Sequence, residues 1–180
     1  MQLAYVTMSG RGAVDEFIAD VVRVFECDGL RLAGTVREKP ADLLGHPWDM
    51  DLRVLPDGPA FRISQPLGSG AKGCRLDSGV IETIATAVEA GLPQADILIV
   101  NKFGKLESQG RGFGPAISMA LDMGLPTLVG VNEMNTPDFL AFSGGLGEAL
   151  LPDCSTVRAW YGSAPKPRVP AAVWKTLAAR

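Results

Sequence analysis

The sequence predicts a single doubly wound α/β domain, with a mostly parallel sheet of about five to six strands and helices on both faces. Short apolar runs alternate with segments of helical periodicity, and glycine-rich loops separate the two. The run Ile97–Val100 has no polar residue, which is typical of a strand buried on both faces of a parallel sheet. With 180 residues, the chain is long enough for one such domain and too short for two.

The N-terminal part predicts a β-α-β unit. Residues 3–8 form an apolar run that ends at a glycine loop. From Val14 to Phe25, apolar side chains follow the spacing of one helix face, and Gly29 is expected just beyond the end of that helix. Residues 30–36 then predict a second strand, which leads into a loop that begins at Arg37.

A hairpin and a second helix are expected next. Residues 52–55 and 60–64 predict two short strands around a turn rich in proline and glycine, inserted between β-α-β units. From Ile81 to Leu92 the apolar spacing is again helical, with Asp77 or Ser78 as the N-cap.

In the C-terminal half, predicted strands again alternate with predicted helices. After the central strand at 97–100, the spacing predicts a helix around residues 117–121 and a buried strand at 127–131. A last helix is expected over 137–151, broken at Gly144-Gly145, and an edge strand over 156–161. The domain is expected to span residues 1–162, and residues 163–180 to form a proline-rich strap with a short helix at 171–179.

The composition argues against several classes of function. The net charge of -3 excludes the global basic field that drives nonspecific nucleic-acid binding. No apolar run approaches the roughly 18 residues of a membrane span, so no membrane insertion is expected. The first eight residues lack the basic and long apolar regions of a secretory signal, and we expect a cytoplasmic protein. The chain has one histidine and three cysteines without a C-x-x-C pair, so no metal site is expected.

Basic residues are concentrated in the loops that follow the predicted strands. Eight of the 17 lysines and arginines fall there: Arg11, Arg37, Lys39, Lys72, Arg75, Lys102, Lys105 and Arg111. Ligands bind at the carboxyl ends of strands in doubly wound folds, and glycine loops beside helix N-termini favour anions. The sequence thus predicts a site for a small anion, with a solvated polar rim as the alternative.

The strongest single stretch follows the most buried strand. We expect an anion to contact Asn101, Lys102, Lys105 and Arg111 there, together with the backbone amides of the glycines, at Gly110 and Gly112. Glu107 is the candidate catalytic residue, as the one carboxylate of the loop. It could orient a water, bind a metal or pair with a neighbouring lysine.

Two other glycine loops supply candidate anion ligands. The first comprises Ser9, Gly10, Arg11 and Gly12, and the second includes Lys72, Gly73 and Arg75. The first loop stands where a phosphate-binding loop would be, but neither the lysine nor the hydroxyl residue of G-x-x-x-x-G-K-[ST] follows Gly12. The second matches G-x-G-x-x-G formally but lacks the helix start and the acidic residue of a dinucleotide site. Whether Cys74 contacts a ligand stays open.

These loops also carry a family resemblance. Its residues are Gln65, Leu67, Gly68, Gly73-Cys74-Arg75-Leu76-Asp77, Asn101-Lys102-Phe103-Gly104-Lys105, Glu107, Gly110, Arg111 and Gly112. In them the sequence resembles a bacterial domain family of unknown function that is often encoded beside molybdate-transport genes. The resemblance extends to about Leu150. More distantly, the sequence resembles small P-loop nucleoside triphosphatases, with Asn101 near the place of their metal-coordinating acid.

The resemblance implies a P-loop-like fold and an oxyanion ligand, either molybdate or the phosphate of a nucleotide that magnesium accompanies. The leading expectation is a cytoplasmic oxyanion-binding protein that serves molybdenum uptake or handling. The first alternative is a nucleoside triphosphatase or phosphotransferase that uses Glu107 to position water. The second is a non-catalytic regulatory or assembly module, and a homo-oligomer is possible in either case.

Overall fold

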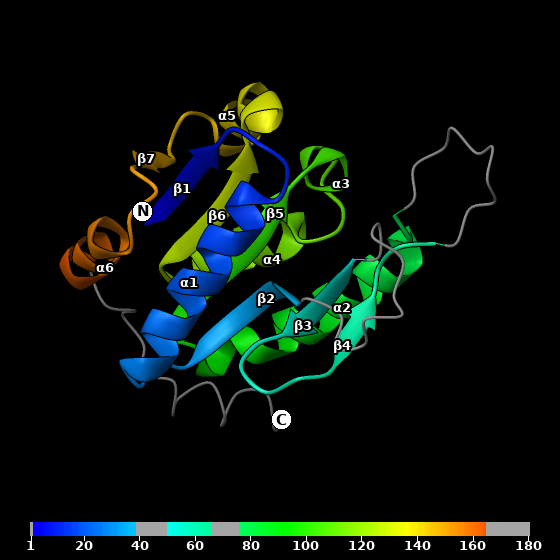
Figure 1. The fold of residues 1–180 in the computed structure, drawn as a ribbon, viewed down its shortest axis with the longest axis horizontal. Coiled ribbons are helices and arrows are strands. Elements are labelled where there is room, and N and C mark those ends of the chain that lie inside the picture. The colour runs from blue at the N-terminus through cyan, green and yellow to red at the C-terminus, as the bar shows by residue number, and fades with distance from the viewer. Residues whose placement is uncertain (1, 39–49, 66–75, 165–180) are drawn as a thin grey trace.

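The computed structural model describes residues 2–38, 50–65 and 76–164, which form a seven-stranded sheet with helices on both faces (Figure 1). The order of the strands is β4-β3-β2-β5-β6-β1-β7. The strands are β1 (Leu3–Met8), β2 (Leu32–Glu38), β3 (Asp51–Val54), β4 (Ala60–Arg62), β5 (Ile97–Phe103), β6 (Thr127–Asn132) and β7 (Glu148–Leu150). The predicted doubly wound α/β class is confirmed, with more strands than expected.

The helices include those that the apolar spacing predicted around residues 14–25, 81–92 and 117–121. They are α1 (Ala13–Cys27), α2 (Ser78–Gly91), α3 (Lys105–Ser108), α4 (Gly114–Asp122), α5 (Thr136–Ser143) and α6 (Cys154–Ser163), with 3-10 turns at Leu92–Gln94 and Glu133–Asn135. Asp77 is the N-cap of α2, and its side chain accepts hydrogen bonds from the amides of Gly79 and Val80. This confirms one of the two predicted caps.

The strand directions place the carboxyl ends of the central strands at one edge. β1 pairs with β6 and β7, and β5 pairs with β2 and β6, all in parallel. The inserted hairpin is confirmed, because β3 pairs antiparallel with both β2 and β4. As Figure 1 shows, it extends the sheet beyond β2. Parallel strands end on the same side, so the loops after β1, β2, β5 and β6 meet there.

Apolar side chains fill two layers, one on each face of the sheet. One layer contains side chains of α2 and α4, with Ile84 and Ile117 completely buried. The other contains α1 and α6, where the rings of Phe25 and Tyr161 lie 5.3 Å apart. The strands β1, β2, β5 and β6, buried between these layers, hold their carboxyl ends in a fixed geometry.

Two sequence predictions are wrong at the edge of the sheet. Residues 156–161 lie in helix α6 instead of an edge strand: Val157, Trp160 and Tyr161 are buried at helical spacing, and Asp153 caps the amide of Thr156. Residues 148–150 form β7 instead of the second half of a helix. That helix stops at Gly144, and β7 pairs with residues 4–6 of β1, which would otherwise present an unpaired edge.

Two strands end later in the chain than predicted. β2 extends to Glu38 and β5 to Phe103, so Arg37, Asn101 and Lys102 lie within strands instead of in loops. Strand residues have less freedom than loop residues, which fixes the direction of these three side chains. Of the predicted C-terminal strap and helix, residues 165–180 lie outside the described residues.

Candidate functional site

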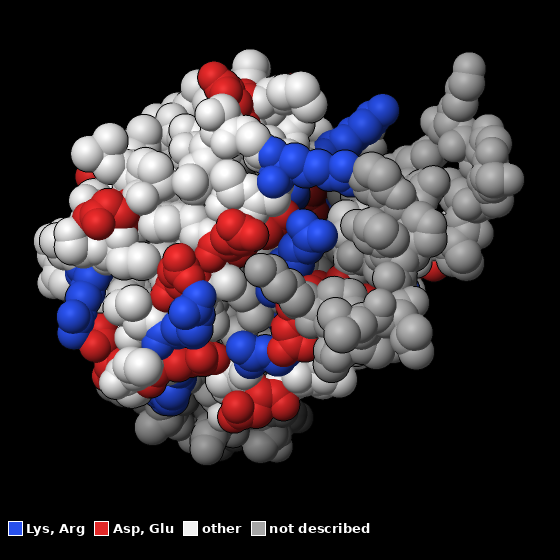
Figure 2. Space-filling model, viewed as in Figure 1, with Lys and Arg blue, Asp and Glu red and all other residues white. Residues whose placement is uncertain are grey.

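A cavity of about 550 Å³ opens at the carboxyl ends of β2 and β5. Its polar lining comes from Asp15, Arg37, Asn101, Lys102, Lys105 and Arg111, among others. Figure 2 shows basic side chains gathered on this part of the surface. Among the described residues, four lysines and arginines line the cavity against the two carboxylates Asp15 and Glu107, in a protein whose net charge is -3. Its chemistry is therefore that of an anion site.

Asp15 is the centre of a charged network at this cavity. Its side chain is 5% exposed, and it accepts hydrogen bonds from Asn101 Nδ2 at 2.8 Å and from Arg37 Nη1 at 2.9 Å. Lys102 Nζ lies 3.3 Å from the same carboxylate. Two cations share one carboxylate, which leaves a net positive charge beside the cavity. The side chains of Arg37 and Lys102 are 33% and 37% exposed, so both reach solvent and a ligand as well as Asp15.

Asn101 joins this network to the backbone of the sheet. Its Oδ1 accepts a hydrogen bond from the Arg37 amide at 3.1 Å, while its Nδ2 donates to Asp15. Because β2 and β5 are neighbours, this amide bridges the ends of two adjacent strands. Asn101 is itself buried, and it therefore positions Arg37 and Asp15.

The first glycine loop lies beside this network but does not line the cavity. Gly12 is the N-cap of α1, and a Cβ built on it would lie 3.9 Å from Arg37 Nη1. The first turn of α1 already carries the carboxylates of Asp15 and Glu16, which complement the positive end of the helix dipole. Among the described residues that line the cavity, none belongs to Ser9–Gly12.

We expect Asp15→Asn to lower the free energy of unfolding by about 2 kcal/mol, because Arg37 and Lys102 would repel each other without a shared carboxylate. Urea unfolding followed by circular dichroism measures this. The matched control is Asp20→Asn, since Asp20 pairs with Arg23 on the exposed surface of the same helix and its side chain is 52% exposed. It should change stability by less than about 0.5 kcal/mol. Equal midpoints for the two variants would contradict the assigned role of Asp15.

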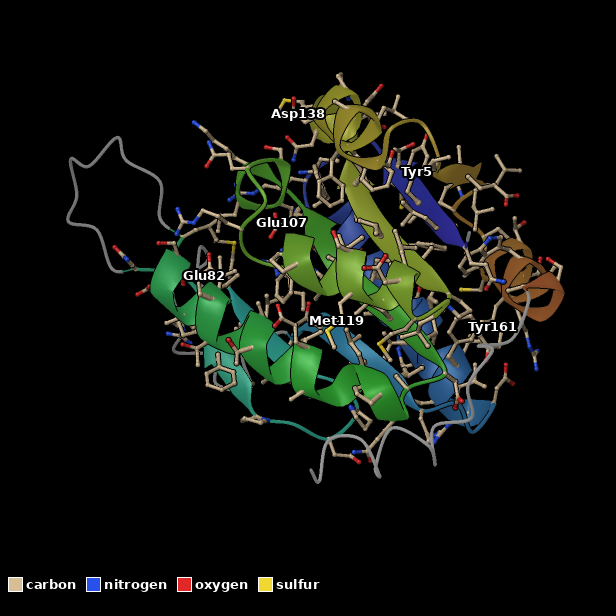
Figure 3. All side chains as sticks on the ribbon, turned by 180° about the vertical axis from the view of Figure 1, so that it is seen from behind. Tyr5, Glu82, Glu107, Met119, Asp138 and Tyr161 are labelled. Atoms are coloured by element: carbon tan, nitrogen blue, oxygen red, sulfur yellow. The ribbon has the colours of Figure 1, made fainter. Side chains whose placement is uncertain are left out.

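Glu107 is buried within the loop that follows β5. Its Oε2 accepts a hydrogen bond from the Gly104 amide at 2.9 Å, and its Oε1 accepts one from the Phe113 amide at 3.2 Å. Burial raises the pKa of Glu107 above its ordinary value, and the charge of Glu82 acts in the same direction. Figure 3 shows Glu82 on α2 and Glu107 on α3 on the same side of the sheet. The carboxylate thus holds the two ends of the loop together.

The glycines of this loop serve its internal geometry. A Cβ built on Gly112, whose φ is +55°, would lie 2.4 Å from Glu107 Oε1. The Gly112 amide donates to Glu82 Oε1 at 3.1 Å, and the Gly110 amide donates to the carbonyl of Glu107. Both amides have acceptors within the protein, so the anion site proposed below relies on side chains. Neither glycine is among the described lining residues.

The structure brings together Asn101, Lys102, Lys105, Glu107 and Arg111, all of which line the cavity. The candidates Lys72, Gly73 and Arg75, and also Cys74, lie outside the described residues. The sequence analysis missed Asp15 as a site residue and placed Arg37 in a loop. The helical spacing could have indicated Asp15. It precedes Ile18 by three residues and Val22 by seven, which places its carboxylate on the buried face of the helix, where a charged group needs a partner.

The described part of the chain carries neither a membrane-spanning helix nor a cluster of metal-ligating side chains. No helix in it is long and apolar enough to cross a bilayer. It also brings together no group of three or more histidine, cysteine, aspartate or glutamate side chains suited to a metal ion.

Comparisons with known proteins agree with the resemblance noted in the sequence. The chain is 33% identical over 149 residues to the molybdenum import ATP-binding protein ModC 2 of Bradyrhizobium diazoefficiens, and the match covers 82% of this chain but only 17% of that protein. The fold resembles that of a human cancer-related nucleoside triphosphatase, with a TM-score of 0.57 and 16% identity over 83% of this chain and 87% of the other. This second likeness confirms the P-loop-like fold. Residues 3–160 match the model of the family described as "Protein of unknown function (DUF2478)", and the chain therefore belongs to that family.

Proposed function

We propose that this protein binds a small oxyanionic ligand in the cavity at the carboxyl ends of β2 and β5. The observation that carries the proposal is the charge of the lining: Arg37, Lys102, Lys105 and Arg111 surround a space whose two carboxylates are both engaged. Asp15 is held by Arg37, Lys102 and Asn101, and Glu107 by two backbone amides. Arg37 and Lys102 share the one carboxylate of Asp15, and Arg111 Nε lies 3.4 Å from Glu82 Oε1, so these carboxylates neutralise the four cations only in part.

The name of the similar transport protein gives two first candidates for the anion, molybdate and the phosphates of ATP. Because the match covers 17% of that protein, it supports a role for this domain beside molybdenum import and does not extend to the whole transporter subunit. We propose that the chain serves molybdenum uptake or handling, from the cytoplasmic side.

The geometry favours binding over hydrolysis. After Gly12 the chain continues with Ala13 and Val14, which offer neither an amine for the β- and γ-phosphates nor a hydroxyl for magnesium. A magnesium ion also finds no free carboxylate among the described lining residues, because Asp15 and Glu107 both have partners. In this proposal Glu107 positions the loop and does not react. The alternative of an assembly module depends on residues 163–180 and stays a prediction.

The first experiment compares molybdate, tungstate, sulfate and ATP with magnesium in thermal unfolding. A ligand present at about 100 times its Kd adds roughly 2.7 kcal/mol of stability, which raises Tm by several degrees in a domain of this size. We expect at least one of these anions to stabilise the protein, and stabilisation that falls with rising sodium chloride concentration. If none of them shifts Tm at millimolar concentration, the proposal is wrong.

The double variant Lys102→Ala/Arg111→Ala is expected to weaken anion binding about 100-fold, since each charge-assisted hydrogen bond lost costs about 1.5 kcal/mol or more. Isothermal titration calorimetry with the stabilising anion measures this. The matched control is Arg23→Ala/Arg158→Ala, which removes the same charge from exposed ion pairs with Asp20 and Asp28. Equal loss of affinity in both double variants would show that net charge, and not this cavity, sets the binding.

A further inference from the structure

The cavity is much larger and more apolar than an inorganic oxyanion requires. Its volume of about 550 Å³ falls in the range of pockets that hold drug-sized organic molecules, roughly 300–1,000 Å³. Beyond the polar residues, it is lined by Met50, Leu52, Ile63, Ile81, Phe103 and Phe113. A tetrahedral anion bound at the cations would leave this apolar surface without a partner.

Most of the apolar lining comes from elements that carry none of the cations. The cations lie at the end of β2, in β5 and in the segment 105–111 that follows it. The apolar side chains come mainly from β3 with the residue before it, the chain after β4, and α2, while Phe103 and Phe113 lie beside the cations; most belong to the buried layer on the α2 face of the sheet. The cavity therefore has one cationic side and one apolar side. A ligand that complements both sides carries its negative charge at one end of an apolar body.

Thr35 gives an independent indication of what this ligand contains. It lies in β2, lines the cavity and is fully buried, yet its hydroxyl finds no hydrogen-bond partner among the described residues. A buried hydroxyl without a partner destabilises the protein, and such groups are rare unless a ligand or water satisfies them. Side chains two residues apart in a strand point to the same face, so Thr35 lies on the same face of β2 as the buried Ala33 and as Arg37.

We infer that the natural ligand is an organic phosphate with a flat, largely apolar or aromatic body, and not a bare inorganic oxyanion. Its phosphate lies among Arg37, Lys102, Lys105 and Arg111, its body packs against the apolar side, and a polar atom of the body pairs with the Thr35 hydroxyl. This inference rests on the anion site proposed above and adds the class of molecule that carries the anion.

Calorimetric titration of the full chain with inorganic phosphate, phenyl phosphate and phenol tests the apolar part. Burying one aromatic ring contributes about 1.5–3 kcal/mol, so phenyl phosphate should bind at least tenfold more tightly than inorganic phosphate. Phenol, which lacks the charge, should bind more weakly than phenyl phosphate. If both phosphates bind equally, the inference is wrong and the proposed anion site stands. If phenyl phosphate binds as tightly to Lys102→Ala/Arg111→Ala as to the wild type, the anion site itself is wrong.

Thr35→Val tests the polar contact, because valine has the shape of threonine without the hydroxyl. The variant should raise Tm of the ligand-free protein by a few degrees, since an unpaired buried hydroxyl is removed. Among the four nucleoside 5′-monophosphates, whose rings carry polar atoms, the tightest binder should lose about tenfold in affinity for the variant. Affinity for phenyl phosphate should be unchanged.

The matched control is Thr86→Val, because Thr86 is exposed on α2 and its hydroxyl bonds within its own helix. It should change neither Tm nor any affinity measurably. A Thr35→Val variant that is less stable than the wild type would overturn the assignment of an unpaired hydroxyl. Unchanged nucleotide affinity in that variant would overturn the contact with the ligand.

Discussion

Gly34→Ala is expected to abolish folding, with a loss of more than about 4 kcal/mol in the free energy of unfolding. Gly34 lies in β2 opposite Ile99 of the central strand β5. A Cβ at this position would lie 1.8 Å from the carbonyl oxygen of Ile99 and 2.7 Å from its carbonyl carbon. Both atoms belong to the backbone of a strand that is buried on both faces, so neither can move aside without breaking the pairing of β5 with its neighbours.

The backbone angle adds to this steric effect. The φ of Gly34 is +122°, a conformation that residues with a Cβ rarely adopt. The matched control is Gly29→Ala, because Gly29 also has a positive φ, +75°, but a Cβ there meets nothing within 4 Å. Its cost should be only about 1 kcal/mol. Urea unfolding followed by circular dichroism separates the two, and similar midpoints would show that the contact with β5 is not what requires glycine at position 34.

Glu107→Ala should lower the free energy of unfolding by about 3 kcal/mol. The substitution removes the acceptor of the Gly104 and Phe113 amides, and the residue is only 5% exposed, so water replaces it poorly. Glu107→Gln should have an intermediate effect, because its single carbonyl oxygen can accept from one of the two amides while its NH₂ group faces the other. The loop that carries Lys105 and Arg111 should then lose part of its order, and anion affinity should fall with stability.

The pH dependence of Glu107 gives this prediction a separate test. Burial raises the pKa of the folded state above the ordinary value of 4.5, so the folded protein holds the proton more tightly than the unfolded chain. The contribution of this group to stability is therefore fully present below pH 4.5 and is lost as the pH rises through the raised pKa.

A glutamine side chain does not ionise, so the stability of Glu107→Gln lacks the pH-dependent contribution of the Glu107 carboxyl. Unfolding both proteins in urea between about pH 4 and pH 8 should show the advantage of the wild type shrinking as the pH rises. Subtracting the stability of the variant from that of the wild type isolates the part of the pH dependence that Glu107 contributes. An advantage that grows with pH would mean that hydrogen bonds outweigh burial at this carboxylate and that its folded pKa lies below the ordinary value.

Much of the fold follows from local patterns in the sequence. The apolar run at 97–100 predicted the central strand, the helical spacing from Val14 to Phe25 predicted α1, and the turn at 56–59 predicted the hairpin. These features can be predicted because they depend on residues close in the chain, whose periodicity reports directly on burial. The basic residues after β5 were likewise placed at the correct edge, because a parallel sheet collects the carboxyl ends of its strands.

The elements at the far edge could not be predicted in this way. The strand β7 has three residues and no apolar alternation, and it forms because β1 offers a free edge. The helix α6 has an apolar spacing that a short strand could share, and its identity depends on packing against α1. In both cases the deciding partner lies more than 100 residues away along the chain.

The sequence alone thus determined that this protein is a doubly wound α/β domain whose cations gather at one edge of its sheet. Only the tertiary structure decided what those cations surround. It brought Asp15 from α1 to Arg37 and Lys102, engaged Glu107 with the backbone of its own loop, and placed the apolar side chains of β3 and α2 beside the cations. Spacing along a chain records which residues are buried, but the pairing of distant charges and the shape of an empty space depend on how separate elements pack against one another.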